Sequence, residues 1–353
     1  MSFAAAPEYQ VFPTRERALK PYAAAVRASS VTRELIRSVD PQVVVADILT
    51  VAAALAAELE ERPWVTLVPH VMPMGQPGFP IYALGAVPAR TAAGNRLWRL
   101  TRPLLMKGEQ QGRRELNGAR ERVGLPPLCH VHGGISRELA LVATFPQLEY
   151  PRPVPEPWLR VTGPLLWQQP FGEVELPPGT DPLVLVAPST SQDPEHQLVR
   201  AALAGLVGEP VRVLATLNRR PPSRPLQVPD NARVVDWVSY ARTMPHCQAV
   251  VCHAGHGTLA RALHCGAPVV ACPHAGDQAE NAARIRWANV GVSLPRRFVS
   301  ARGLRLAVRR LLGDSRYAEG AASLARWSAG NDGAAAAADA VEGVSSPYPH
   351  GVR

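Results

Sequence analysis

Residues 250–281 read VVCHAGHGTLARALHCGAPVVACPHAGDQAEN and set the architecture of this chain. The apolar run 249–252 is long enough for a buried strand. Residues 258–265 then predict a short helix, and the apolar run 268–272 predicts a second strand. Strands that alternate with helices in this way are typical of an α/β fold with a parallel sheet.

The turn between the first strand and its helix has the composition of an anion site. Gly255 and Gly257 allow backbone N–H groups to come close to a bulky anion, and the helix that follows points its positive end at the same place. His253 can add a ring N–H, and Thr258 can add a hydroxyl. The turn therefore predicts a diphosphate site at the carboxyl edge of a parallel sheet.

Two better-known phosphate motifs do not fit this turn. A P-loop needs a lysine that is absent here, and the third glycine of the dinucleotide fingerprint falls on Ala260. A tight turn that binds nothing remains the alternative. Further along, Asp277 and Glu280 are spaced as in a capping box and predict the start of another helix.

The composition indicates an ordinary globular chain. Its 353 residues suit two domains of roughly 100–200 residues each, and 46% hydrophobic with 19% charged residues is typical of globular proteins. No apolar run reaches the roughly 18 residues that a membrane span needs. The first residues, MSFAAAPEYQVFPTRER, lack the basic and apolar segments of a signal peptide.

The net charge of +9 admits a nucleic-acid or membrane partner. However, Lys20 and Lys107 are the only lysines, so the charge comes almost wholly from arginine, as a GC-rich coding bias would produce. The arginines are scattered, without interleaved aromatic residues. We therefore expect no nucleic-acid partner.

The five cysteines are Cys129, Cys247, Cys252, Cys265 and Cys272. An odd number without a CxxC pair argues against a disulfide framework and against a zinc ribbon, and cysteines within apolar strands are usually small core residues. Four of them lie near histidines in the sequence, which leaves metal binding as an alternative. We expect no metal and a reducing, cytoplasmic setting.

The first half of the chain contains a strand–helix–strand unit, with strands at 42–46 and 64–68 around a helix at 50–61. Asp47 lies where the first strand gives way to the helix, at the edge where open α/β sheets bind ligands. The loop 69–87, rich in Pro, Gly and Met, is long enough to suggest a functional role as a pocket wall. Residues 89–122 predict a basic helical segment.

Strands and helices also alternate through 183–328, which predicts a doubly wound α/β domain. The proline-rich stretch YPRPVPEP at 150–157 is a stiff connector near the middle of the chain. We expect an N-terminal domain at 1–165, a linker at 166–180 and a C-terminal domain at 181–330. Residues 331–353 would form a last helix and a loose tail.

The chain resembles the GT-B glycosyltransferases, a broad family that includes UDP-glycosyltransferases and macrolide glycosyltransferases. The resemblance covers 180–330 well and 40–180 more loosely. Its motifs are Trp237-Val238, His-x-Gly-x-Gly-Thr at 253–258, Gly-x-Pro at 266–268 and Asp-Gln-x-x-Asn at 277–281. The resemblance implies two Rossmann-like domains, and it implies inverting transfer of a hexose from a UDP- or dTDP-sugar to a hydroxyl of a hydrophobic small molecule, without a metal or other cofactor.

The resemblance also implies roles for individual residues. Trp237 would stack on the nucleotide base, although a core tryptophan is the alternative. The turn after His253 would hold the diphosphate, and Asp277 would read sugar hydroxyls, although a helix cap alone explains that residue. The donor-binding residues implied in this way are Ser189, Thr190, Trp237, Val238, His253, Gly255, His256, Gly257, Thr258, Asp277 and Gln278.

The chain departs from the family pattern in two places. Arg261 stands where many members carry a glutamate that holds the ribose, so the donor is expected to differ in type or affinity. The N-terminal loop with the general-base histidine has no counterpart, and the N-terminal domain is therefore expected to be incomplete at its start. Asp47 matches the catalytic acid that orients this histidine. His70, His130 and His132 are conceivable substitutes, although a lone histidine is more often structural.

Three functions stay open at this stage. The first is a hexosyltransferase whose partners are a nucleotide sugar and a hydrophobic acceptor. The alternative is a catalytically impaired donor-binding protein, or an auxiliary partner of a transferase. A third is another GT-B enzyme, a sugar-nucleotide 2-epimerase or a lipid-linked GlcNAc transferase, whose acceptor at a membrane surface would suit the basic charge. A homodimer is not excluded.

Overall fold

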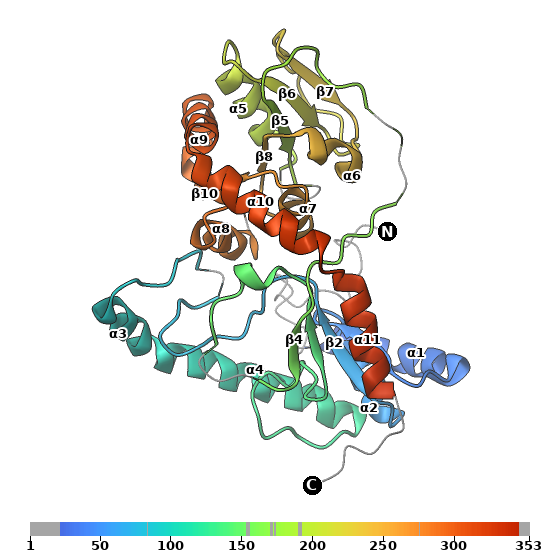
Figure 1. Cartoon of the computed structure of the whole chain (residues 1–353). Helices are drawn as coiled ribbons and strands as arrows, with labels where there is room; N and C mark the ends of the chain where they lie inside the picture. Colours follow the sequence, from blue (N-terminus) through green and yellow to red (C-terminus); the bar gives the residue numbers. More distant parts are fainter. Residues whose placement is uncertain are drawn as a thin grey trace.

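The computed structural model describes residues 22–345 except 83, 153–155, 170, 171, 173, 190–192 and 275. The described part contains two parallel sheets with helices packed around them (Figure 1). The N-terminal sheet has the strand order β1-β2-β3-β4, and the C-terminal sheet has the order β10-β9-β8-β5-β6-β7. The predicted α/β class with parallel sheets is confirmed.

The N-terminal sheet begins with the predicted strand–helix–strand unit. β1 (Val44–Asp47) pairs in parallel with β2 (Trp64–Val68), and α2 (Val51–Leu59) connects them. α1 (Ala23–Val39) packs on α2, where Ala25 and Leu55 belong to one buried cluster. The sheet continues with β3 (Ala140–Val142) and β4 (Leu159–Val161). The sequence did not predict β4, because three residues beside a proline-rich stretch show no strand pattern.

The predicted basic helix at 89–122 is divided in two. α3 (Ala92–Leu100) and α4 (Arg102–Val123) meet at Thr101, which keeps helical backbone angles. Pro103 lies in the first turn of α4, where its missing N–H leaves no partner unsatisfied. The two helices therefore follow one another with an interruption in hydrogen bonding at their junction.

The C-terminal sheet contains every strand predicted in the second half, together with the unpredicted edge strand β10. Its strands are β5 (Leu183–Ala187), β6 (Arg212–Thr216), β7 (Ala232–Val235), β8 (Ala249–Cys252), β9 (Val269–Ala271) and β10 (Gly291–Ser293). Its helices are α5 (Gln197–Leu206), α6 (Tyr240–Thr243), α7 (His256–His264), α8 (Gln278–Trp287), α9 (Ala301–Gly313) and α10 (Ser315–Ala329). Short 3₁₀ turns occur at η3 (Pro146–Leu148), η4 (Met244–His246) and η5 (Arg296–Phe298).

The strand order changes direction between β5 and β8. β5 pairs with β6 on one side and with β8 on the other, so the chain leaves β5 toward one edge and returns at β8 toward the opposite edge. The connections after these two strands diverge at the carboxyl edge, which is where open α/β sheets form a ligand crevice. The glycine turn after β8 begins in this crevice.

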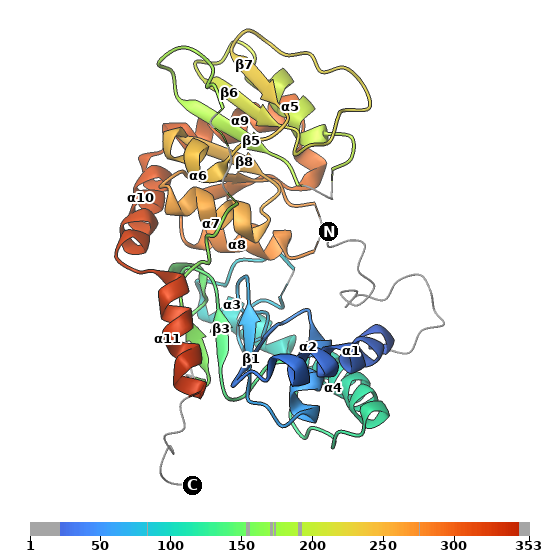
Figure 2. The same cartoon turned by 90° about the vertical axis from the view of Figure 1, so that its right-hand side faces the viewer.

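The last helix returns to the N-terminal sheet. α11 (Gly333–Ser345) lies along this sheet (Figure 2), and its Ala337 and Ala340 are buried with Val65, Leu139 and Leu141. The predicted last helix is therefore present, and the predicted tail beyond 345 lies outside the described residues. The first residue of α11 lies close to the segment that follows β4. A Cβ added to Gly333 would lie 2.7 Å from the carbonyl carbon of Gly163.

The two sheets share an apolar core. Val71, Phe145 and Leu148, which follow the carboxyl ends of β2 and β3, belong to the same buried cluster as Leu185 and Leu259 of the C-terminal sheet and its helices. The Phe145 ring also meets Trp327 of α10 edge-on, with 5.8 Å between ring centroids. The carboxyl edges of both sheets therefore face the same interface, and ligands of the two sheets would meet there.

Candidate active site

The turn after β8 is held in an uncommon backbone conformation. Ala254 has a φ of 61°, which a residue with a side chain adopts only where its surroundings enforce it. The Ala254 N–H donates to Cys252 Sγ at 3.3 Å, and the Asn281 side chain donates to the Ala254 carbonyl at 2.9 Å. Asn281, the last residue of the Asp-Gln-x-x-Asn motif, therefore fixes the turn from α8.

The start of α7 is open in front of this turn. A Cβ added to Gly255 or to Gly257 would meet no atom within 4 Å. Among the described residues, the amides of Gly255, His256 and Gly257 have no hydrogen-bond acceptor. N–H groups at a helix start that face open space form an anion site without further side chains.

His253 links this turn to the loop after β5. The Ser189 N–H donates to His253 Nδ1 at 2.8 Å, so the ring proton is on Nε2, which lies 3.7 Å from Asp193 Oδ2. Asp193 in turn accepts from the amides of Gln197 and Leu198 at the start of α5. Burial lowers the pKa of His253 to about 4, against the opposing effect of Asp193, so the ring is neutral at pH 7.

His256 contributes its backbone to the open turn but directs its side chain elsewhere. The ring is buried, and its Nε2–H donates to the carbonyl of Ala143, just after β3 of the N-terminal sheet, at 3.2 Å. Burial lowers its pKa to about 4, with His70 as a nearby second cause. The side chain of His256 therefore joins the two sheets, and only its amide faces the crevice.

The remaining residues of the implied donor site differ in how far they are buried. Trp237 follows β7 and is half-buried, and the guanidinium of Arg219 lies 4.8 Å from the centroid of its ring. The side chain of Val238 is buried in the core. Thr258 lies beside the half-buried Tyr240, whose phenol its hydroxyl can bond. Thr190 lies outside the described residues.

The helix predicted to start at Asp277 is present as α8, but the Asp277 side chain does not make the capping-box hydrogen bond. Asp277 precedes α8, but its backbone is already helical (φ −72°, ψ −11°) and its side chain caps no amide. An N-cap carboxylate reaches the first amides from an extended backbone, and this geometry is lost here. Asp277 Oδ2 accepts from Asn281 Nδ2 at 2.9 Å instead, and Gln278 Oε1 accepts from the amide of His274 at 2.8 Å.

Glu280 belongs to a buried network that sequence reasoning missed. It accepts from Arg284 Nε at 2.8 Å, and Arg284 donates to the Leu148 carbonyl at 3.0 Å and lies 3.4 Å from the centroid of the Tyr150 ring. Glu149 Oε1 accepts from the amide of Met72 in the loop 69–87 at 2.7 Å. The i, i+4 spacing of Glu280 and Arg284 was the one available signal, but such pairs usually lie on solvated faces. The network joins α8 to the predicted pocket wall.

The four catalytic candidates in the first half of the chain, one aspartate and three histidines, lie in different places. Asp47 accepts from the Leu49 amide at 2.8 Å, and in the described part of the chain no histidine bonds to it. His70 follows the carboxyl end of β2, and its Nδ1–H donates to the Val71 carbonyl at 2.8 Å, which leaves Nε2 as a proton acceptor. His132 instead lies 3.3 Å from Glu109. His130 precedes β3 in the chain, and burial lowers its pKa, with Arg137 and Arg120 as further causes.

The part of the chain that the structure describes holds no cluster of three or more potential metal-ligating His, Cys, Asp or Glu residues. Nor does any helix within it combine the length and apolar character of a membrane span. The five cysteines are free, and Cys252 and Cys272 are buried within or next to strands, as predicted for small core residues.

Comparison with solved structures identifies the class of this architecture. The structure superposes on the glycotransferase of kitacinnamycin with a TM-score of 0.71 at 22% identity, covering 95% of this chain and 84% of that one. It also matches the glycosyltransferase VinC, solved in complex with DTDP, with a TM-score of 0.64 at 17% identity over 98% of this chain and 86% of that one. The chain has the GT-B fold, with two Rossmann-like sheets that face a common crevice.

Sequence comparison adds a matching family model and a relative. Residues 200–342 match the family model described as Erythromycin biosynthesis protein CIII-like, C-terminal domain. The chain is 32% identical over 243 residues to a 4'-demethylrebeccamycin synthase of Lentzea aerocolonigenes, an alignment that covers 66% of this chain and 56% of that protein. This chain thus spans little more than half the length of that relative. Both matches agree with the resemblance to GT-B glycosyltransferases that the motifs predict.

Proposed function

We propose that this chain is a glycosyltransferase that moves a hexose from a UDP- or dTDP-sugar to a hydroxyl of a hydrophobic small molecule. The observation that carries the proposal is the helix start at Gly255–Gly257, where an added Cβ would meet no atom within 4 Å and the amides have no acceptor among the described residues. A nucleotide sugar presents a diphosphate of the charge and size that such a site accepts. The DTDP bound to the related structure supports a thymidine nucleotide as one candidate.

In the proposed reaction, the acceptor oxygen attacks the anomeric carbon from the face opposite the diphosphate. The bond between this carbon and the phosphate oxygen breaks, the diphosphate keeps the electron pair, and the configuration inverts. Fixed amide dipoles at Gly255 and Gly257 stabilise the charge that develops on the leaving group, so the step needs no metal. Asp277 and Gln278, at the start of α8, would bind sugar hydroxyls.

The acceptor hydroxyl must lose a proton to a base. Of the three histidines considered, His70 is the one at the carboxyl edge of the N-terminal sheet. Its Nδ1 is engaged with the Val71 carbonyl, so Nε2 can accept a proton as a base must. We therefore assign His70 as the proposed base. Asp47, bound to the Leu49 amide at the neighbouring strand end, would contribute negative charge to the same edge.

The first experiment tests the donor site alone. Isothermal titration of the chain with UDP and with dTDP is expected to give saturable binding to at least one nucleotide. Gly257→Asp places a carboxylate into the open space and is expected to weaken binding at least about tenfold by like-charge repulsion. Gly108→Asp, at another helical glycine with open surroundings, is the matched control. A folded protein that binds neither nucleotide would reject the donor site.

The second experiment separates transfer from the alternative of a donor-binding protein without activity. Release of free UDP or dTDP is followed with a panel of hydrophobic alcohols and phenols. An enzyme is expected to release nucleotide in an acceptor-dependent manner, and His70→Gln should abolish this release while nucleotide binding persists. Nucleotide binding without release from any acceptor would favour the auxiliary role.

A further inference from the structure

A basic segment leads from the end of the loop 69–87 into α4. Between residues 90 and 108 the chain carries five cations and no Asp or Glu. The cations are Arg90, Arg96, Arg99, Arg102 and Lys107. The formal charge of this segment is therefore +5.

The helix within this segment exposes a stripe of leucines. No residue of α3 is buried. Leu97, Leu100 and Leu104 are 64%, 71% and 70% exposed. Their spacing of three and four residues places them on one face, because Thr101 continues the helical backbone between α3 and α4. Other leucines of the chain are exposed singly, whereas these three lie together on one helix face and form a contiguous apolar patch.

A neighbouring face of the same helices attaches them to the protein. Trp98 and Leu105 line a small pocket together with Gly75 and Phe79 of the loop 69–87. The contact at Leu105 is close, because a Cβ added to Gly75 would lie 2.5 Å from its side chain. The leucine stripe is therefore not a core face that lacks its cover: the helices are already anchored through another face.

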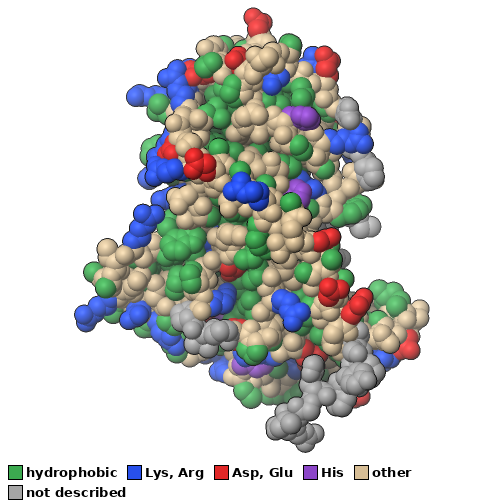
Figure 3. All heavy atoms as spheres, viewed as in Figure 1, with side chains coloured by type: hydrophobic (Ala, Val, Ile, Leu, Met, Phe, Trp, Pro, Cys, Tyr) green, Lys and Arg blue, Asp and Glu red, His purple; other side chains and the backbone are tan. Residues whose placement is uncertain are grey.

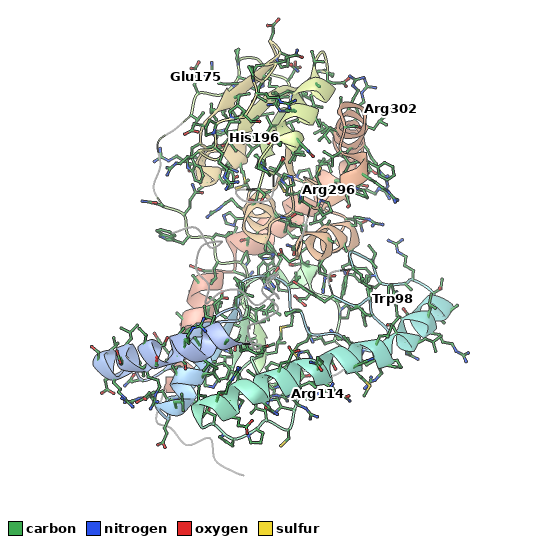
Figure 4. All side chains as sticks on the ribbon, turned by 180° about the vertical axis from the view of Figure 1, so that it is seen from behind. Trp98, Arg114, Glu175, His196, Arg296 and Arg302 are labelled. Atoms are coloured by element: carbon green, nitrogen blue, oxygen red, sulfur yellow. The ribbon has the colours of Figure 1, made fainter. Side chains whose placement is uncertain are left out.

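The figures place this surface at an outer edge of the molecule. α3 projects beyond the N-terminal sheet at the left of Figure 1, and Figure 3 shows hydrophobic and basic side chains together at the same edge. In Figure 4, seen from behind, Trp98 is labelled where α3 and α4 meet, and Arg114 lies farther along α4. α3 therefore lies at the periphery of the molecule.

We propose that this surface, residues 90–108 with the stripe Leu97, Leu100 and Leu104, docks on an anionic lipid bilayer. An exposed apolar stripe flanked by cations on a surface helix matches the surface of an anionic bilayer. The leucines would enter the acyl region, and the cations would meet the negative headgroups. A second copy of the chain fits less well, because pairing two such surfaces would bring ten cations together without an acid. Docking would place the loop 69–87 next to the lipid, from which a hydrophobic molecule could enter.

The test is co-sedimentation of the full chain with vesicles, without nucleotide or acceptor, so that it does not depend on the proposed sugar transfer. Vesicles of phosphatidylcholine with phosphatidylglycerol are compared with phosphatidylcholine alone. Binding is expected to need the anionic lipid and to weaken as salt is raised. The variant Leu97→Ser, Leu100→Ser, Leu104→Ser is expected to reduce partitioning by about tenfold or more, because all three side chains are exposed and their loss does not open the core.

The control variant carries Val207→Ser, Val228→Ser and Leu306→Ser, three exposed apolar residues elsewhere, with Leu306 on the arginine-rich helix α9. It should bind vesicles like the original chain. Light scattering of both variants checks for association between copies. Absence of binding to anionic vesicles, an equal loss in the control, or a change of oligomeric state with unchanged vesicle binding would each overturn the proposal.

Discussion

At the residue scale, the site depends on side chains that hold backbone in place. Ala254 adopts its left-handed conformation because Cys252 and Asn281 bond to its peptide groups, and His253 bonds to the amide of Ser189. None of these contacts requires a ligand. The open amides at Gly255 and Gly257 are therefore positioned before any anion binds, which reduces the reorganisation that binding and catalysis would cost.

The two buried histidines predict how stability depends on pH. His253 and His256 have pKa values lowered to about 4, whereas unfolded histidine titrates near pH 6.5. The unfolded chain therefore binds more protons between these values, and stability falls as pH decreases from about 6.5 to 4, by roughly 2–3 kcal/mol for each histidine. Urea unfolding at a series of pH values measures this slope.

His256→Gln isolates one contribution. Glutamine can still donate to the Ala143 carbonyl but does not titrate, so the variant should lose less stability on acidification than the original chain. Parallel curves for the two proteins would show that His256 is not buried in its neutral form.

Removing the cation of the buried network should be costly. Arg284→Met removes the guanidinium that the buried Glu280 binds and leaves Glu149 with Arg152 at 4.0 Å, and it is expected to destabilise the protein by about 3–5 kcal/mol. Arg286→Met, two residues along the same helix and exposed, is the control and should change stability by less than about 0.5 kcal/mol. Thermal unfolding of both variants makes the comparison, and similar melting temperatures would contradict the network's role.

At the scale of elements, the helices at the crevice take their positions from partners in both sheets. α7 contacts β3 through His256, and α8 is held to the loop 69–87 through Arg284, Glu149 and Met72. α11 crosses to the N-terminal sheet at Gly333, beside Gly163. Motion of one sheet relative to the other would therefore move the start of α8, where the sugar is proposed to bind.

The two glycines of α11 should respond oppositely to the same substitution. Gly333→Ala places a Cβ 2.7 Å from the Gly163 backbone and should destabilise the protein by about 1–3 kcal/mol. Gly343→Ala meets open space and should stabilise the helix by about 0.5–1 kcal/mol. Urea unfolding of both variants tests the close contact between Gly333 and Gly163. A Gly333→Ala variant that is more stable than the original chain would contradict this contact.

At the scale of the whole molecule, the N-terminal sheet is completed by the end of the chain, and the crevice is built from both sheets. Val65, Leu139 and Leu141 are covered by Ala337 and Ala340 of α11. The proposed diphosphate site, in contrast, depends on β5, β8, α7 and α8. Loss of α11 should therefore affect folding and nucleotide binding to different degrees.

A chain that ends at Gly330 tests this separation. It is expected to unfold at lower urea concentration, because the apolar residues under α11 become exposed. Its affinity for UDP or dTDP should stay within about twofold of the original chain, because α11 packs on residues of the N-terminal sheet and the turn belongs to the C-terminal sheet. Titration calorimetry measures this, and a parallel loss of nucleotide binding would show that the two sheets are not separable in this way.

Much of the fold is readable from local patterns. The strands β2, β5, β7 and β8 have the predicted bounds, because short apolar runs between turn residues leave few alternatives. The glycine turn was predicted as an anion site because glycine and a helix start act through the backbone, whose chemistry does not depend on distant residues. The bounds of α3 and α4 and the strands β4 and β10 were not predicted, since short edge strands and a helix interruption leave weak local signals.

The placement of side chains followed from packing between segments far apart in the chain. His256 stands between two glycines of the motif, yet its ring reaches Ala143, and Asp277 bonds to Asn281 rather than capping its own helix. Glu149 and Arg284 became neighbours because two parallel sheets meet at their carboxyl edges. Periodicity and spacing specify a backbone, whereas the partner of a long polar side chain depends on which elements the three-dimensional packing brings within a few ångströms.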